Sequence, residues 1–437
     1  MGRRKNLLVV ISHDLGRHLG CYGQGSVRTP NIDRFAGEGI RFANSFCTSP
    51  GCSPARAALW TGRYPHANGV VGLAHAGFQN DLNPGERHFA EILRESGYAT
   101  HLFGIQHESP DPRRCGYEFI SGKGWDTLAD EVVDFLQAPR KDERPWFAQV
   151  GDFRPHRPFP HEGVETKDPS DVEVPPYLPD IPEVREDLAE MEASIEALDR
   201  DMGFILEALD RSGERDDTLV VFTADHGIAF PHSKMTLYDP GIEVPILLQG
   251  SGLPRRAVFE EAVSHVDLFR TMLEYLGIPG SEQVHGRSFL PLLQGEAYEP
   301  REAIFAEKTF HAYYDPMRCI RTSQWKLIAN FENTPFQELG PDFNNNVKGY
   351  PETILAWEVE RGRLQHAPYE LYDLEKDPQE SRNLADSPEH REVLHSLVKR
   401  LYDWMVETMD PLLEGPIPQR AFILRMEAFK ALGKGGA

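Results

Sequence analysis

The chain has 437 residues, of which 40% are hydrophobic and 26% are charged, and these proportions are typical of a soluble globular protein. Its 46 basic and 68 acidic residues give a formal charge of −22, which argues against nucleic acid as a partner held by overall charge. Five cysteines in a chain of this length do not form the dense pattern of a disulfide-stapled domain.

The N-terminal segment combines basic residues with an apolar run, Leu7–Ile11, that stops at His13 and Asp14. A signal peptide needs a longer apolar core and a small-residue cleavage site, so we interpret this run as a first buried strand. No stretch approaches the roughly 20 apolar residues of a membrane span. We therefore expect no membrane partner and a cytoplasmic location for the chain as given. A periplasmic or secreted location would follow if a leader has been removed.

Four apolar, β-branched runs end in polar residues, which is typical of strands covered on both faces. These runs are Asn6–Ser12, Ala99–Gly104, Trp146–Val150 and Thr218–Thr223. Helical patterns lie between or after them, at Pro30–Glu38, His88–Ser96, Val184–Ser212 and His265–Leu276. The alternation predicts an α/β domain whose mostly parallel central sheet is flanked by helices. In such sheets the ligand site lies beyond the carboxyl ends of the strands.

The pattern changes after about Leu293. Short strand-like runs and one amphipathic helix follow, at Met317–Thr322, Trp325–Phe331, Tyr369–Leu374 and His390–Thr408. The first two runs are separated by only two residues and indicate a hairpin. We predict a small C-terminal antiparallel sheet with a packing helix. The expected boundary gives a catalytic α/β domain of residues 1–310 and an α+β subdomain of residues 311–437.

The strongest local signal is the segment CSPARAALWTGR, which begins at Cys52. Pro54 suits the first turn of a helix, so Cys52 would lie at a helix N-terminus. Free N–H groups and the helix dipole favour negative charge at such a place. A cysteine that only caps a helix is the alternative interpretation. The pattern C-x-P-x-R followed by x-x-L-x-T-G-R is similar to the signature of the sulfatase family.

The resemblance implies an alkaline-phosphatase-like fold and a specific nucleophile. In sulfatases the cysteine is oxidised after translation to formylglycine, and the hydrated aldehyde attacks the substrate. Covalent catalysis of this kind divides one difficult step into two easier ones. Cys52 would then be the precursor of the nucleophile, Arg56 would be catalytic beside it, and a formylglycine-generating enzyme would be a partner during maturation.

Two pairs of polar residues, His13-Asp14 and Asp225-His226, each follow a predicted strand. Carboxylates beside an anionic substrate would repel it, so we expect one divalent metal ion there, which would also polarise the attacked oxygens. A turn or a helix cap is the alternative for each pair alone. The predicted ligands are His13, Asp14, Cys52, Asp225 and His226. We expect Ca²⁺, which the resemblance implies as the family's usual ion; because imidazole ligands suit transition metals better, Mn²⁺ or another transition metal is the alternative.

Other positions correspond by context to functional residues of the family. Lys234, in PHSKMTLYDPG, corresponds to its sulfate-binding cation, and His156, in FRPHRPF, to a candidate general acid. His75, in GLAHAGF, lies near the region that forms the sugar pocket in related enzymes, and we treat it as a candidate substrate-binding residue. An ordinary surface lysine and an ordinary loop histidine are the alternatives for Lys234 and His75.

His107, in FGIQHES, corresponds to the histidine of the family motif G-K-x-H and is a candidate catalytic residue. Here the sequence departs from the family, because Ile105 stands where the motif has lysine. One cation that normally grips the substrate or the nucleophile is therefore missing. The candidates to replace it are Arg56, Arg154 and Arg157.

The likeness extends along most of the chain. Within the family, the segments Asn68–Leu73, Phe222–Pro245 and Glu370–Glu380 resemble the sulfamidase branch. This implies hydrolysis of a sulfate ester or a sulfamate, with a small molecule or a glycosaminoglycan-type saccharide as substrate. Substrate pockets diverge quickly on a shared scaffold. Self-association into a homo-oligomer is compatible with the sequence.

Three further hypotheses stay open. The pair Asp225-His226 and the absent lysine at Ile105 resemble the phosphonate monoester hydrolase branch, so a phosphonate monoester or phosphodiester hydrolase is the main alternative. A non-catalytic anion-binding relative would keep Cys52 unoxidised. A thiol hydrolase would use Cys52 itself with a histidine base.

Overall fold

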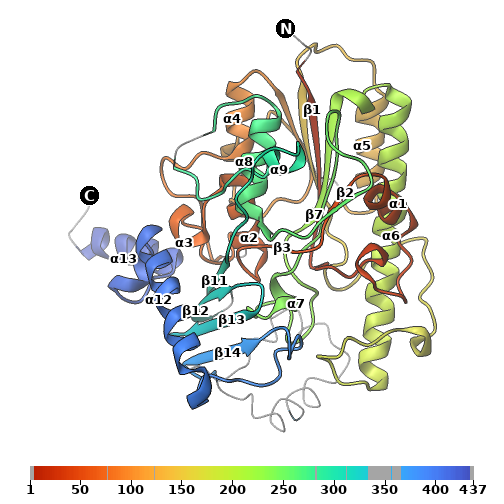
Figure 1. The fold of residues 1–437 in the computed structure, drawn as a ribbon. Coiled ribbons are helices and arrows are strands. Elements are labelled where there is room, and N and C mark those ends of the chain that lie inside the picture. The colour runs from red at the N-terminus through yellow and green to blue at the C-terminus, as the bar shows by residue number, and fades with distance from the viewer. Residues whose placement is uncertain are drawn as a thin grey trace.

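The computed structural model describes residues 4–75, 77–122, 124–280, 283–311, 313–332, 356 and 366–433. Within these residues a large sheet flanked by helices lies beside a smaller sheet formed by the C-terminal part of the chain (Figure 1). None of the helices seen in these ranges has the length and apolarity needed to cross a membrane.

The larger sheet has the strand order β5-β4-β6-β1-β7-β8-β2-β9. Its strands are β1 (Asn6–Ser12), β2 (Ile40–Phe42), β4 (Ala99–Gly104), β5 (Phe119–Ser121), β6 (Trp146–Gly151), β7 (Thr218–Ala224), β8 (Ile246–Gln249) and β9 (Ala257–Phe259). β1 pairs in parallel with β6 and β7, and β4 pairs in parallel with β5 and β6. Only β8 runs antiparallel to its neighbours among these strands. The predicted mostly parallel sheet is confirmed.

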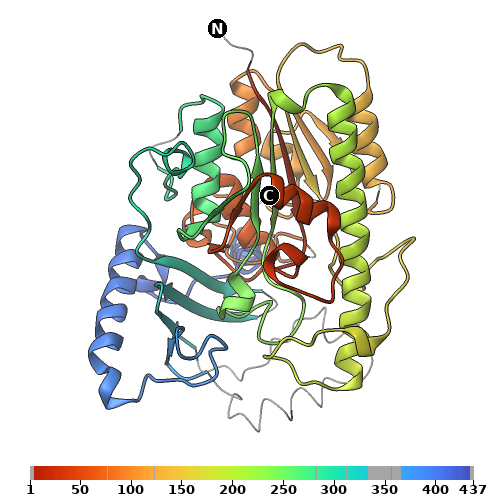
Figure 2. The same ribbon diagram turned by 45° about the vertical axis from the view of Figure 1, so that its right-hand side comes forward.

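The central strand β1 is apolar throughout because both faces of the sheet are covered. Leu8 and Val10 belong to a buried cluster that includes residues of α1, α5 and α6. Leu7, Val9 and Ile11 belong to a second cluster with residues of α2, α4 and α8. Figure 2 shows the long α6 on one side of the sheet and α8 on the other. This double cover explains why a continuous apolar run, rather than an alternating one, predicts the strand.

Helices cover both faces and carry the predicted amphipathic patterns. Those around the large sheet are α1 (Pro30–Glu38), α2 (Cys52–Thr61), α3 (Pro65–Asn68), α4 (Phe89–Glu95), α5 (Leu128–Gln137), α6 (Pro182–Ser212), α7 (Asp239–Ile242), α8 (His265–Tyr275) and α9 (Leu290–Leu293). In α6 the predicted apolar stripe from Met191 to Leu209 is buried against the sheet. A parallel pair of two-residue strands, β3 (Ser45–Phe46) and β10 (Val263–Ser264), lies beside the larger sheet.

The smaller sheet is antiparallel, with the order β11-β12-β13-β14. Its strands are β11 (Ile304–Phe310), β12 (Tyr314–Arg321), β13 (Trp325–Asn330) and β14 (Tyr369–Asp373), and the helices that follow are α12 (Arg391–Glu407) and α13 (Arg420–Gly433). Leu401 and Trp404 of α12 pack against Ile320 and Leu327 of the sheet. The predicted sheet with a packing helix is confirmed. The sheet begins at β11, ahead of the expected boundary between residues 310 and 311.

Candidate active site

Four neighbouring strands end at one edge of the large sheet, and each is followed by a predicted site residue. In the order β4, β6, β1, β7 these are His107, His156, the pair His13 and Asp14, and the pair Asp225 and His226. Adjacent parallel strands place their carboxyl ends side by side. Residues up to 213 positions apart in the sequence therefore meet because of strand order alone.

Cys52 is the first residue of α2, as the sequence predicts, and the whole helix is buried. Its side chain is 3% exposed. One potential ligand atom from each of Cys52, His13 and His107 lies within 4.8 Å of the others. The helix N-terminus directs unsatisfied backbone N–H groups and the positive end of the dipole toward this point. The surroundings of Cys52 therefore suit a group that carries negative charge during a reaction.

His13, Asp14, Asp225 and His226 form a compact, fully buried group, with one potential ligand atom of each within 4.8 Å of the others. Nδ1 of His13 lies 2.7 Å from Oδ1 of Asp14 and 3.4 Å from Oδ2 of Asp225. Nε2 of His226 lies 3.2 Å from Oδ1 of Asp14. Two buried carboxylates and two imidazoles at this spacing are a donor set that fits one divalent cation.

The electrostatics of this group favour the protonation states that a cation needs. Burial alone would raise the pKa of Asp14, but Lys234 and the surrounding imidazoles hold it well below its ordinary value. The pKa of Asp225 is likewise lowered, against burial, by His13, His226 and Arg56. Burial lowers the pKa of His13 to about 4. At neutral pH the carboxylates are therefore ionised and this imidazole is neutral, as metal ligands must be.

Two cationic side chains adjoin the carboxylates. Lys234 donates from Nζ to Oδ2 of Asp14 over 2.7 Å. Arg56 donates from Nε to Oδ2 of Asp225 over 2.9 Å, and from Nη2 to the carbonyl oxygen of Ser12 over 3.3 Å. Both predicted cations thus lie at the site.

The other two arginines proposed to replace the missing lysine form ion pairs with carboxylates outside the ligand group. Arg154 is buried and pairs with Asp152 at 2.6 Å and with Asp201 at 2.7 Å. Arg157 pairs with Asp187 and donates to the backbone of Ala229. Both guanidinium groups neutralise acidic residues around α6 and the segment after β6. Of the three arginines proposed to replace the lysine, Arg56 is the one whose ion pair is with a carboxylate of the ligand group.

Histidines extend from the carboxylate group toward the surface. Nε2 of His156 lies 3.9 Å from Oδ2 of Asp14, and its ring centroid lies 4.5 Å from that of His13. The ring of His107 lies 5.2 Å from His13 and 4.7 Å from His75. His156 and His107 are half-buried, whereas His75 is exposed. The structure thus places His75 at the outer rim, beside the residues predicted to be catalytic.

Glu108 is a buried residue that sequence reasoning missed. It is 0% exposed, and burial raises its pKa to about 7 although Arg56 acts to lower it. The sequence signal that could have identified Glu108 is its position next to His107, shortly after the end of a predicted strand. Glu108 and Asp225 both act to raise the pKa of Arg56, so the two acidic residues share the electrostatic environment of one guanidinium.

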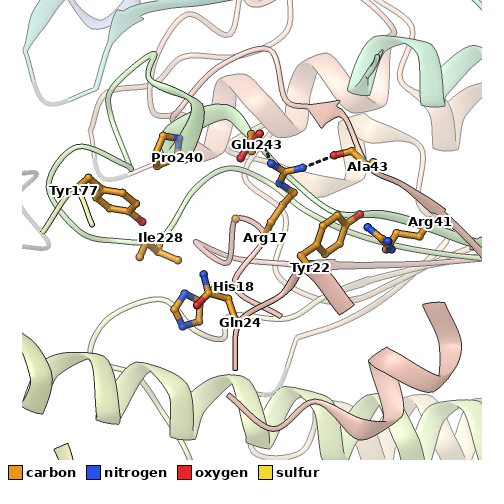
Figure 3. Close-up of a pocket in the computed structure, with 11 residues that line it drawn as sticks. Arg17, His18, Tyr22, Gln24, Arg41, Ala43, Tyr177, Ile228, Pro240 and Glu243 are labelled. Atoms are coloured by element: carbon orange, nitrogen blue, oxygen red, sulfur yellow. Dashed lines mark hydrogen bonds and ion pairs between the residues drawn. The ribbon is translucent and has the colours of Figure 1, made fainter. Parts of the chain in front are cut away.

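A separate pocket of about 300 Å³ is lined in part by Gly16, which lies two residues after Asp14 in the sequence (Figure 3). Its walls include Arg17, Tyr22, Tyr177 and Glu243, and no predicted site residue is among the residues that line it. Arg17 forms an ion pair with Glu243 and donates to the carbonyl oxygen of Ala43. Because none of the predicted site residues lines this pocket, the carboxylate group remains the candidate active site.

Fold and site together define a hydrolase of alkaline-phosphatase-like architecture, with a candidate nucleophile at a buried helix N-terminus. The family model described as Sulfatase matches residues 5–278. A second model, described as N-sulphoglucosamine sulphohydrolase, C-terminal, matches residues 226–348. The chain belongs to the sulfatase family, whose members hydrolyse sulfate esters and sulfamates, and formylglycine dependence is the general mechanism of that family.

One relative in sequence agrees with this assignment, and two solved structures share the fold. The human N-sulphoglucosamine sulphohydrolase is 30% identical, and the alignment covers 95% of this chain and 92% of that protein. The structure of BT4656 in complex with its substrate D-glucosamine-2-N,6-O-disulfate has a TM-score of 0.72 at 18% identity, covering 94% and 99% of the two chains. The phosphonate monoester hydrolase of Agrobacterium radiobacter has a TM-score of 0.73 at 22% identity, covering 95% and 100%.

Proposed function

We propose that the protein hydrolyses a sulfate ester or sulfamate of a sulfated sugar, with formylglycine made from Cys52 as nucleophile. The observation that carries this proposal is the position of Cys52, which begins a buried helix and lies with His13 and His107 in one group of potential ligand atoms. The adjoining carboxylates and two cations supply the remaining parts of an anion-cleaving site. Formylglycine would supply a hydroxyl nucleophile and a route for releasing sulfate.

The residues of this chain then have distinct roles. The N–H groups at the start of α2 stabilise negative charge at position 52. Lys234 and Arg56 bind the anionic oxygens of the substrate, which orients the sulfur toward position 52. His156 contacts the carbonyl oxygen of Arg157 through Nδ1 at 2.6 Å, which orients Nε2 toward Asp14. From there Nε2 holds the proton that the leaving group takes up.

One divalent metal ion would be held by His13, Asp14, Asp225 and His226. The ion would neutralise the two carboxylates and polarise the oxygens of the bound anion. A set of two nitrogen and two carboxylate ligands differs from the all-oxygen sets that Ca²⁺ prefers. We therefore propose Mn²⁺ or another transition metal ion as the working ion of this chain, in place of the family's usual Ca²⁺.

Metal removal tests this ion assignment. Protein stripped with a chelator is expected to lose turnover, and Mn²⁺ is expected to restore more of it than Ca²⁺ does. The matched variant is His13→Asp, because it replaces one nitrogen ligand by oxygen and should shift the preference toward Ca²⁺. Initial rates are measured against the concentration of each ion. Full restoration of the unmodified protein by Ca²⁺ alone would contradict the assignment.

The sugar part of the proposal is supported by the relatives. The human relative is named for N-sulphoglucosamine, and the solved complex holds a doubly sulfated glucosamine. His75 is exposed and its ring lies 4.7 Å from that of His107, a position that suits contact with a sugar whose sulfate is bound at the buried site. We propose His75 as a substrate-binding residue on that ground.

Hydrolysis of a phosphonate monoester or phosphodiester is the second candidate function. The pair Asp225-His226 and the apolar Ile105 favour it. Matched initial rates on N-sulfoglucosamine, an aryl sulfate and the corresponding aryl phosphonate separate the two. We expect kcat/KM to be higher for a sulfated compound by at least about tenfold, or ~1.4 kcal/mol of transition-state stabilisation. A higher value for the phosphonate would replace the first proposal by the second.

A further inference from the structure

Lys234 lies in an irregular segment, yet its side chain is buried and aimed at one partner. Residues 228–238 form neither helix nor strand, and Nζ of Lys234 donates to Oδ2 of Asp14 over 2.7 Å. His232 and Met235, which flank this lysine, have positive φ angles of 63° and 76°. Residues other than glycine rarely adopt this conformation because it is sterically costly. The segment therefore needs contacts from outside to keep Lys234 in place.

Those contacts come from the small C-terminal sheet. Lys326 of β13 is fully buried, and its Nζ donates to the carbonyl oxygen of Leu237 over 3.1 Å and lies 2.6 Å from Oδ1 of Asp239. Arg321 of β12 forms a second ion pair with Asp239, at 2.9 Å. Figure 1 shows α7, which begins at Asp239, between the large and the small sheet. The small sheet thus holds the chain three and five residues after Lys234.

Two glutamates, at the first and last positions of one sulfamidase-like segment, complete this arrangement. Glu380 is buried, its Oε2 accepts the N–H of Asp239 over 2.5 Å, and its Oε1 lies 2.7 Å from Nζ of Lys326. Glu370 accepts the hydroxyl of Tyr238 through Oε2 over 2.8 Å. We call Lys326, Asp239 and Glu380 the tether.

Short hydrogen bonds connect the tethered residues to Lys234. Oγ of Ser233 donates to the carbonyl oxygen of Pro240 over 2.7 Å, which closes residues 233–240 into a loop. The N–H of Met235 donates to the carbonyl oxygen of Pro50 over 2.9 Å, and Pro50 belongs to the segment that leads to the nucleophile. A displacement of the tethered residues would therefore move Lys234 as well.

We propose that Lys326 is a positioning residue for Lys234. By holding residues 237–239, it fixes the loop conformation in which Lys234 reaches the anion-binding position beside Asp14. A buried ion pair suits this task because removing one partner leaves an uncompensated charge, so alternative arrangements are disfavoured. The inference rests on the proposed function in one respect, namely that Lys234 binds the substrate anion. It gives the small sheet a part in orienting the substrate.

A double-mutant cycle tests this proposal. The tether variant Lys326→Met/Glu380→Gln removes one positive and one negative charge together, and glutamine keeps an oxygen for the N–H of Asp239, so the subunit should still fold. We expect kcat/KM per folded molecule to fall about tenfold when Lys234 is present, and less than about threefold when the same changes are made in Lys234→Met. An equal loss in both backgrounds, or no loss in the first, would overturn the proposal.

The matched control for the tether variant is Asp410→Asn. Asp410 is buried and pairs with Arg318 of β12 at 3.0 Å, so its loss perturbs the small sheet through a different ion pair. This variant should lose stability, while kcat/KM per folded molecule changes by less than about twofold. A tenfold loss of kcat/KM in Asp410→Asn would show that any weakening of the small sheet has this effect, and it would overturn the specific role of Lys326.

Hydrogen–deuterium exchange gives a readout that does not depend on turnover. Residues 229–244 should exchange faster in the tether variant than in the unmodified protein or in Asp410→Asn. Unchanged exchange would overturn the proposal. If the unmodified protein cleaves the aryl phosphonate and not the sulfated compounds, the proposed function fails, and the cycle is measured on the phosphonate. If it cleaves neither, the exchange result decides.

Discussion

Replacing Cys52 by alanine is expected to abolish turnover while the protein stays folded. Removing one sulfur atom from a side chain that is 3% exposed costs about 1 kcal/mol of unfolding free energy, which a domain of this size tolerates. Loss of the nucleophile should lower kcat by a factor of about 10⁴ or more. Initial rates, circular dichroism and the thermal midpoint are compared for the variant and the unmodified protein.

The matched control for Cys52→Ala is Cys21→Ala, a half-buried cysteine of the segment before α1. This variant should keep its turnover. Peptide mass spectrometry across position 52 shows whether the thiol has become an aldehyde in active protein. Thiol alkylation adds a second criterion, because it inactivates a thiol hydrolase and leaves a formylglycine enzyme active. A Cys52→Ala protein with most of its turnover would remove the covalent mechanism.

The neighbouring strands β4, β6, β1 and β7 of the large sheet could be predicted because a strand covered on both faces is mostly apolar. β1 and β4 have the predicted bounds to the residue. β11 was missed because its sequence, IFAEKTF, contains Glu307 and Lys308. Both are buried: Glu307 contacts the imidazole of His66, and Lys308 forms an ion pair with Asp315. Tertiary contacts of this kind let a charged segment form a buried strand, and no local pattern reveals them.

The candidate site could be assembled from the sequence because parallel strands place their ends together. The partners of individual side chains could not be assigned in this way. Arg154 and Arg157 lie next to His156 in the sequence, yet they bind carboxylates on and before α6. Glu108 was missed because its importance comes from burial beside Arg56, which depends on the tertiary structure. Local sequence gives the types of residue at a strand end, and the tertiary structure decides their contacts.

Replacing Asp225 by asparagine should damage both turnover and stability. Oδ1 of Asp225 accepts the backbone N–H groups of Asp14 and His226, each over 2.9 Å, and Oδ2 accepts Nε of Arg56. The amide of asparagine keeps one acceptor oxygen but directs its N–H groups at the donors that Asp225 accepts. The substitution also removes the negative charge of a metal ligand and leaves Arg56 buried without its anion. We expect kcat/KM to fall by a factor of about 10³ or more and the unfolding free energy by about 3–5 kcal/mol.

The matched control separates the two effects. Asp201→Asn breaks a buried pair with Arg154, at 2.7 Å, that lies outside the ligand group. This variant should lose stability by a similar mechanism, while each folded molecule keeps its turnover. Denaturant unfolding gives the stability of both variants, and active-site-normalised rates with added metal give the turnover. If Asp225→Asn lost only stability, as Asp201→Asn should, Asp225 would be a structural partner of Arg56 and the cation would have to be held without it.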